Sequence, residues 1–350
     1  MATFDRLQDL PLTIDSYELE AREADVSSGF LRHTTTIVLK GAGHTGVGED
    51  VAYDTEDQVI LQQAGPVLPL AGDWTLGSFC ELIERTNLFP EPAQREASLN
   101  YRVWAYESAA LDLALQQAGQ ALHDVLEMTP RPVRFVCSLR LGEPPQITAP
   151  LEARLANYPD LHFKLDPTPD WDAATIAALA ASGAVQVLDF KGLYEGTTVD
   201  TPADPEFYTR VVNGLPGTWI EDPKLTAEIS EVLAAVHDRV TWDANIHSVA
   251  DIDALPFQPT MVNIKPSRFG PLSELFHAYD TCAERGIAMY GGGQFELGVG
   301  RGQIQYLASC FHPDGPNDVA PTGYNEPNPE PGLPVSPLPV AVSKTGFRWG

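Results

Sequence analysis

Short apolar, β-rich runs alternate with helical patterns along the second half of the chain. Seven such runs occur, at residues 134–139, 161–166, 185–190, 218–222, 239–244, 261–265 and 287–291. They recur every 21 to 33 residues, and the segments between them repeat apolar residues at helical spacing, as in 171–183, 226–239 and 270–286. This is the period of parallel βα units. Seven units in a row predict a closed α/β barrel of the TIM type over residues 131–312, with an open doubly wound sheet as the alternative.

The first 130 residues follow a different pattern. Residues 13–20, 34–40 and 47–53 alternate like antiparallel strands, and residues 102–119 have helical periodicity. Antiparallel strands followed by helices predict a separate α+β domain over residues 1–130. The segment 313–350 is crowded with Pro, Gly and Asn, so we expect it to wrap over a surface and to complete this first domain.

Charge and cysteine content narrow the possible functions. The chain has 48 acidic against 22 basic residues, a formal charge of −26, so nucleic acids and anionic membranes are excluded as partners. It contains no long apolar stretch and begins without an apolar leader, and its four cysteines are far apart, which predicts a cytoplasmic protein with reduced thiols. Only six residues are lysine. A lysine at the end of a predicted strand is therefore informative.

Charged residues stand at the ends of five successive predicted strands. In chain order they are Lys164, Asp189, Glu221, Asp243 and Lys265. Any one of them could be an ordinary loop residue, but strand ends converge at one mouth of a parallel barrel, and the ordered set indicates a site. Three converging carboxylates require a cation, and all-oxygen ligation favours Mg²⁺ or Mn²⁺. A lysine on each side, with its pKa lowered by the ion and the other amine, would suit removal of an α-proton from a small carboxylate substrate.

These strand ends also carry motifs of a known family. The chain resembles the enolase superfamily, and within it the muconate-lactonizing enzyme subgroup, over residues 13 to about 325. The motifs are His162-Phe-Lys164, Val187-Leu-Asp189, Trp219-Ile-Glu-Asp-Pro223, Thr241-Trp-Asp243, the run from Asn263 to Gly270, the glycine-rich run from Gly291 to Arg301, and Gly46-Val-Gly-Glu49 and Glu107 to Asp112 upstream.

The resemblance implies a modified (β/α)7β barrel with an α+β capping domain. It also implies Mg²⁺ on Asp189, Glu221 and Asp243, with Lys164 and Lys265 as opposed acid and base. The glycine-rich run is similar to that of o-succinylbenzoate synthases and N-succinylamino acid racemases, so dehydration or racemisation is the expected reaction. Muconate-type cycloisomerisation and dipeptide epimerisation are alternatives, and so is a non-catalytic binding or scaffold protein. A homo-oligomer is possible.

The sequence departs from the family pattern at two places near the expected site. His162 replaces the first lysine of the family's KxK motif, and Lys191 lies two residues after Asp189. Lys191 could form an ion pair with Asp189, which is the simplest expectation, bind a substrate anion, or partly displace the metal. Arg268 and Arg301 could bind a substrate carboxylate, and Arg268 could instead pair with Glu296. The full set of second-shell or substrate-binding candidates is His162, Lys191, Asn245, Arg268, Gly292, Gly293, Glu296 and Arg301.

Overall fold

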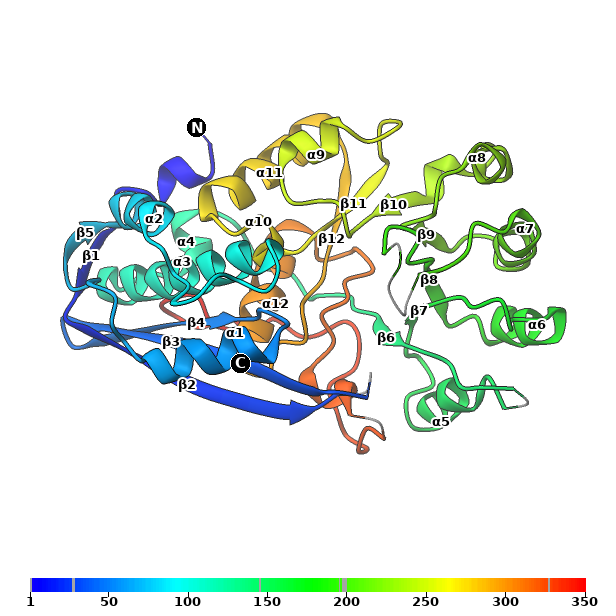
Figure 1. The fold of residues 1–350 in the computed structure, drawn as a ribbon, viewed down its shortest axis with the longest axis horizontal. Coiled ribbons are helices and arrows are strands. Elements are labelled where there is room, and N and C mark those ends of the chain that lie inside the picture. The colour runs from blue at the N-terminus through cyan, green and yellow to red at the C-terminus, as the bar shows by residue number, and fades with distance from the viewer. Residues whose placement is uncertain (1, 27–28, 145, 195, 197–199, 327) are drawn as a thin grey trace.

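The structure is a computed structural model, and it describes residues 2–26, 29–144, 146–194, 196, 200–326 and 328–350. Two parts lie side by side in Figure 1: a mostly antiparallel cap formed by the N-terminal residues, and a parallel barrel formed by the rest of the chain. The four cysteines are unpaired. Within the described ranges no helix is both long and apolar enough to cross a bilayer.

Seven parallel strands form the barrel sheet, in the order β12-β11-β10-β9-β8-β7-β6. Their bounds are β6 Cys137–Leu139, β7 Phe163–Leu165, β8 Val185–Asp189, β9 Trp219–Glu221, β10 Val240–Trp242, β11 Met261–Ile264 and β12 Ala288–Gly291. Each strand falls within one of the seven predicted runs. Leu188, Ile220 and Val262 belong to the buried apolar core, and they alternate along their strands with the residues on the face of Asp189 and Glu221.

Helices follow the strands, and α5 to α8 lie outside β6 to β9 (Figure 1). Their bounds are α5 Ala149–Asn157, α6 Ala173–Ser182, α7 Pro205–Gly214, α8 Ala227–Leu233, α9 Val249–Asp253, α10 Pro266–Phe269, α11 Leu272–Arg285 and α12 Val299–Phe311. Local sequence sets their ends. Asp172 caps α6 by accepting the Thr175 N–H at 2.7 Å, and Gly183 ends it in the left-handed conformation.

A short piece of the C-terminal tail closes the barrel. Asn317 pairs in parallel with Phe135, just before β6, and Asp318 pairs in parallel with Gly292, just after β12. The Val136 N–H donates to the Asn317 carbonyl, and the Asp318 N–H donates to that of Gly291. Residues 317 and 318 therefore take the place of an eighth strand, and this part of the tail lies in the barrel wall. The arrangement is a closed barrel and not the open sheet that we considered as an alternative.

The cap contains a three-stranded sheet and a two-stranded sheet. The strands are β1 Pro11–Ile14, β2 Ser16–Asp25, β3 Leu31–Gly41, β4 His44–Asp50 and β5 Gly72–Thr75, and the helices are α1 Thr55–Ala64, α2 Leu76–Arg85, α3 Ala97–Ala118 and α4 Leu122–Val125. A 3-10 turn at Phe4–Arg6 precedes β1, and further 3-10 turns lie later in the chain, at His237–Arg239 and Thr322–Asn325. The end of the tail returns to the cap, where the Phe347 N–H and the Arg348 guanidinium both donate to Asp112 of α3.

Two carboxylates of the cap bind the N-termini of barrel helices. Glu49 of β4 accepts the N–H groups of Leu297 at 2.7 Å and Gly300 at 2.8 Å, at the start of α12. Glu107 of α3 accepts the N–H of Leu272 at 2.7 Å, at the start of α11. The first N–H groups of a helix have no partner within the helix and favour a negative charge. These two motif residues therefore fix the cap against the barrel.

Glu107 makes the stability of this interface depend on pH. Burial raises the pKa of Glu107 from its ordinary value of 4.5 to about 7, so folding favours the protonated carboxyl. This contribution is fully present below about pH 4.5 and is lost as the pH rises through 7. We expect Glu107 to lower the free energy of unfolding by about 3 kcal/mol between pH 4 and pH 8, on the order of the shift.

Urea unfolding of the wild type and of Glu107→Gln at both pH values measures this effect. The variant should be the less pH-sensitive of the two, because glutamine keeps an acceptor for the Leu272 N–H but cannot ionise. An equal change with pH in both proteins would contradict the assignment.

Candidate active site

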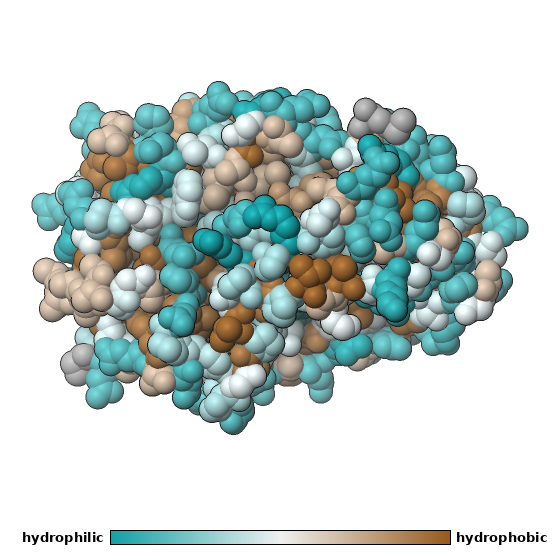
Figure 2. All heavy atoms as spheres, turned by 180° about the vertical axis from the view of Figure 1, so that it is seen from behind, coloured by the Kyte–Doolittle hydropathy of each residue, from teal (hydrophilic) through white to brown (hydrophobic). Residues whose placement is uncertain are grey.

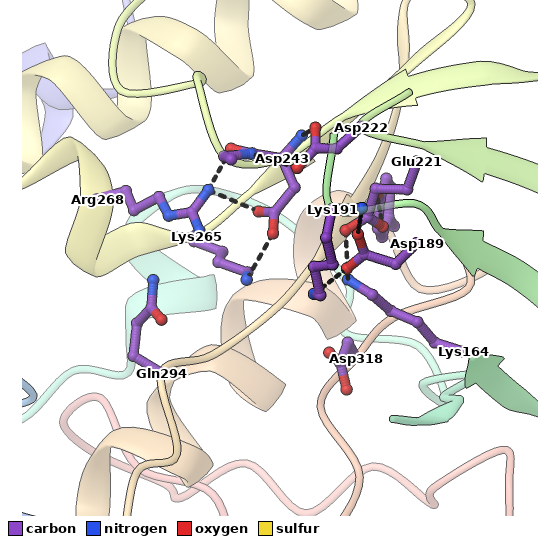
Figure 3. A network of polar contacts seen from close by, with 12 residues as sticks. Lys164, Asp189, Lys191, Glu221, Asp222, Asp243, Lys265, Arg268, Gln294 and Asp318 are labelled. Atoms are coloured by element: carbon purple, nitrogen blue, oxygen red, sulfur yellow. Dashed lines mark hydrogen bonds and ion pairs between the residues drawn. The ribbon is translucent and has the colours of Figure 1, made fainter. Parts of the chain in front are cut away.

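The five predicted strand-end residues meet at one mouth of the barrel. Lys164 lies in β7, Asp189 and Glu221 are the last residues of β8 and β9, and Asp243 and Lys265 directly follow β10 and β11. All five are buried. Parallel pairing in register brings Asp189 opposite Glu221. Figure 3 shows the acids in the centre, with Lys164 on one side and Lys265 on the other.

Lys164 is held by two of the acids. Its Nζ lies 3.0 Å from Asp189 Oδ2 and also contacts Glu221 Oε1, while the hydroxyl of Tyr290 in β12 donates to Glu221 Oε2. Burial alone would lower the pKa of Lys164, but the carboxylates of Asp189, Glu221 and Asp243 outweigh burial and raise it well above its usual range. This differs from our expectation of a lowered pKa, because carboxylates are the nearest charges to this amine.

Lys265 is held by the third acid. Its Nζ lies 2.8 Å from Asp243 Oδ2, and Arg268 of α10 approaches Asp243 Oδ1 at 2.9 Å and also donates to the Asp243 carbonyl. Although burial opposes it, these two cations hold the pKa of Asp243 well below its usual range. Arg268 therefore pairs with Asp243 and not with Glu296. Glu296 pairs with Arg301, at 3.1 Å.

Lys191 also reaches the acids. Its backbone is left-handed, with φ of +53°, and its N–H donates to Asp189 Oδ1 at 3.1 Å. The side chain folds back so that Nζ contacts Asp189 Oδ2, and Asp166 Oδ1 lies 3.8 Å from the same Nζ. The structure thus brings Lys191 to Asp189, as an ion pair. Residues 195 and 197–199 of the loop that follows lie outside the described residues.

The remaining candidates support the site or lie at its edge. A Cβ on Gly292 would stand 2.6 Å from Lys265 Cε, and one on Gly293 would stand 2.1 Å from Glu296 Oε2, so a larger residue at either position would displace the Lys265 or the Glu296 side chain. His162 is half-buried beside β7. Oδ1 of Asn245 is buried without a hydrogen-bond partner among the described residues.

Two acids at the site were missed in the sequence. Asp222 follows Glu221, has φ of +47°, and accepts the N–H groups of Asp243 at 2.8 Å and Ala244 at 2.9 Å. Burial, reinforced by Asp243 and Asp189, raises the pKa of Asp222 to about 7. Asp318 comes from the closing segment and faces Lys164 in Figure 3. The pair Glu221-Asp222 was visible in the sequence, but nothing there marked Asp318, because no strand pattern surrounds it.

The acidic centre fits a hard divalent ion. Asp189, Glu221 and Asp222 each offer an oxygen, and these three oxygens lie within 4.8 Å of one another. We expected Asp243 as the third ligand, but its two oxygens are engaged by Lys265 and Arg268. Six acidic and four basic side chains lie together at this mouth. The acids are Asp166, Asp189, Glu221, Asp222, Asp243 and Asp318, and the cations are Lys164, Lys191, Lys265 and Arg268. Carboxylate oxygens are the donors that Mg²⁺ and Mn²⁺ prefer.

A cavity of about 220 Å³ opens beside the acids, over the ends of β6, β7 and β8. Asp166, Lys191, Arg140, Thr168, Trp171 and Thr201 are among the residues that line it. At the other edge of the mouth, Phe30 of the cap packs edge-on against Phe295 of the glycine-rich loop, with ring centres 5.8 Å apart. Cap and barrel therefore both border the opening.

A parallel barrel joined to an α+β cap is also the fold of solved proteins described as enolase superfamily members. A probable mandelate racemase from Alicyclobacillus acidocaldarius superposes with a TM-score of 0.70 at 20% identity, covering 95% of this chain and 93% of that one. A member of the enolase superfamily from Enterococcus faecalis superposes with a TM-score of 0.66 at 20% identity, over 97% and 94% of the two chains. The predicted fold class is confirmed.

The chain belongs to the family described as domain of unknown function DUF8230. Residues 5–125 match the N-terminal domain of that family and residues 129–326 match its C-terminal domain. An N-succinylamino acid racemase from Amycolatopsis is 28% identical over 206 residues, which is 53% of this chain and 55% of the racemase. An o-succinylbenzoate synthase from Bacillus subtilis is 38% identical over 60 residues, 17% of this chain and 16% of the synthase. The chain thus spans about half the length of the racemase that it matches and a smaller part of the synthase. These relatives are enzymes.

Proposed function

We propose that this protein removes the α-proton of a carboxylate substrate in a reaction that depends on a divalent ion, and then either racemises an N-acylamino acid or dehydrates a precursor of the o-succinylbenzoate type. The observation that carries the proposal is the placement of two lysines on opposite sides of one acidic centre, each paired with a different acid. The partial identity to a racemase and a synthase of this kind supports the same choice.

The lysines would transfer the proton. A divalent ion at the acids would offset the carboxylate charges that raise the pKa of Lys164. As a neutral amine, Lys164 would then take the α-proton, and the electron pair of the C–H bond would move into the bond between the α-carbon and the carboxylate, which gives an enediolate. Lys265, as an ammonium, then returns a proton to the opposite face, which inverts the α-carbon. In dehydration, the enediolate instead expels a β-hydroxyl group, which leaves as water once protonated.

The acids would hold the ion. Asp189 and Glu221 would bind Mg²⁺ or Mn²⁺, with Asp243 as the third ligand once Lys265 leaves its Oδ2. The ion would stabilise the negative charge that develops on the substrate carboxylate. Arg268 keeps Asp243 ionised and in place, and Tyr290 orients Glu221. The low pKa of Asp243 suits a ligand that must stay deprotonated.

Titrations of Asp243→Asn and Asp222→Asn with Mn²⁺ determine which residue is the third ligand. We expect Asp243→Asn to weaken Mn²⁺ binding at least tenfold to a hundredfold, the usual effect of disturbing a metal site. Asp222→Asn should weaken it less, because both carboxylate oxygens of Asp222 already accept backbone N–H groups. The reverse order would assign Asp222 as the ligand.

Exchange of the α-proton in deuterated water tests the reaction itself. The protein would be incubated with Mg²⁺ or Mn²⁺ and, in turn, N-succinylamino acids, dipeptides and cyclohexadiene carboxylates, and deuterium at the α-carbon would be followed by proton NMR. Exchange with N-succinylamino acids or with cyclohexadiene carboxylates supports the proposal. If no compound exchanges with the folded, metal-loaded protein, the proposal is wrong.

A further inference from the structure

Lys191 contacts an acid of the site, and the proposed reaction does not use it. Lys164 and Lys265 take the two proton-transfer positions, whereas Lys191 lies on Asp189, one of the expected metal ligands. The chain builds this contact locally. The left-handed turn at Lys191 and the bond from its own N–H to Asp189 direct the side chain back to the carboxylate two residues earlier.

Both carboxylate oxygens of Asp189 have partners in this arrangement. Oδ1 accepts the N–H of Lys191, and Oδ2 is shared by the ammonium groups of Lys164 and Lys191. A divalent ion that binds Asp189 must therefore compete with an ammonium that is tethered two residues away. Because both cations would be attracted to the same carboxylate and would repel each other, one must give way.

A second position for the ammonium lies next to the first. Asp166, the residue after β7, has an oxygen 3.8 Å from Lys191 Nζ, and its side chain is 27% exposed. Lys191 Nζ also lies 5.5 Å from the centre of the Tyr194 ring. The cavity of about 220 Å³ borders both Asp166 and Lys191, so the side chain has room to rotate away from Asp189.

We propose that Lys191 is a movable counter-ion of the metal site, which neutralises Asp189 when the site is empty and shifts to Asp166 when a divalent ion binds. This rests on the proposed function, since it assumes that Asp189 is a metal ligand. Its consequence is that Lys191 weakens ion binding and Asp166 partly restores it.

Calorimetric titration with Mn²⁺ tests the proposal without reference to activity. Lys191→Gln should bind Mn²⁺ about tenfold more tightly than the wild type, because a competing charge within contact distance is removed. Asp166→Asn should bind Mn²⁺ more weakly, by about threefold or more, because the displaced ammonium loses its second partner. Lys191→Arg keeps the charge and should bind as the wild type does.

Lys224→Gln is the matched control. It removes a lysine charge close to the same cavity, where Lys224 pairs with Asp200 at 3.3 Å, an acid outside the expected metal ligands. Its Mn²⁺ affinity should stay within about twofold of the wild type. Thermal unfolding without metal adds a second readout: Lys191→Gln should be less stable than the wild type while binding the ion more tightly. A purely structural ion pair would lower stability without raising affinity.

The outcomes separate the two proposals. If the wild type binds Mn²⁺ but Lys191→Gln binds it no more tightly, the counter-ion proposal fails and the metal site stands. If neither folded protein binds Mn²⁺ or Mg²⁺ at millimolar concentration, the proposed function fails and the counter-ion proposal fails with it.

Discussion

Alanine at Lys265 is expected to abolish racemisation while leaving proton exchange from one face of the substrate. Lys164 and Lys265 lie on opposite sides of the acids, so each should exchange the proton of one enantiomer. Lys265→Ala should lose exchange of one enantiomer by about 10²- to 10⁴-fold, and Lys164→Ala should lose exchange of the other by a similar factor. The measurement is deuterium incorporation into each enantiomer of an N-succinylamino acid.

The pair of variants provides its own control. Each retains the opposite lysine, so a variant that has misfolded or lost its metal would lose exchange from both faces. Metal titration and circular dichroism verify both proteins beforehand. Full retention of exchange in both variants would show that neither lysine is the base.

Salt is expected to have the largest effect on stability. With a formal charge of −26, the folded chain repels itself, and compaction brings these charges together. Several acids of the cap are largely exposed, among them Glu20 and Glu23 on β2 and Glu81 on α2. Hydrophilic side chains are spread over the face seen in Figure 2. We expect an increase in KCl from 0.1 M to 2 M to raise the midpoint of thermal unfolding by about 5 °C, on the order of a few kcal/mol.

Sucrose at matched osmolality is the control for this experiment. It favours compact states by exclusion from the surface but does not screen charge, so it separates the two causes. A midpoint that is unchanged or lowered by KCl would contradict the prediction. A rise that sucrose reproduces in full would show that charge screening is not the reason.

Salt should have little effect on the buried ion pairs of the site. Lys164 and Lys265 each bind a carboxylate at 3.0 Å or less, and such pairs are little affected by salt because water does not screen them. We therefore expect salt to change the stability of the fold more than the arrangement of the active site. The pKa of Glu107, which burial raises, should likewise persist in high salt.

Periodicity along the chain was enough to locate most of the barrel and five of its charged strand ends. The C-terminal ends of parallel strands lie at the same end of a barrel. The strand-end residues Lys164, Asp189, Glu221, Asp243 and Lys265 were therefore expected at one mouth. Contacts that depend on a turn or on a distant segment of the chain could not be predicted from the sequence and required the tertiary structure. Arg268 could have paired with Glu296, and only the short helix after Lys265 directs it to Asp243.

Asp222, Asp318 and Lys191 show the same limit. The left-handed backbone at Asp222 and at Lys191 turns each side chain in a direction that strand alternation does not predict. Asp318 reaches the mouth because residues 317 and 318 close the barrel from a tail without any periodic pattern. Sequence spacing predicts which residues stand at strand ends. The ion-pair partner of each charged residue depends on which distant segments the tertiary structure brings next to it.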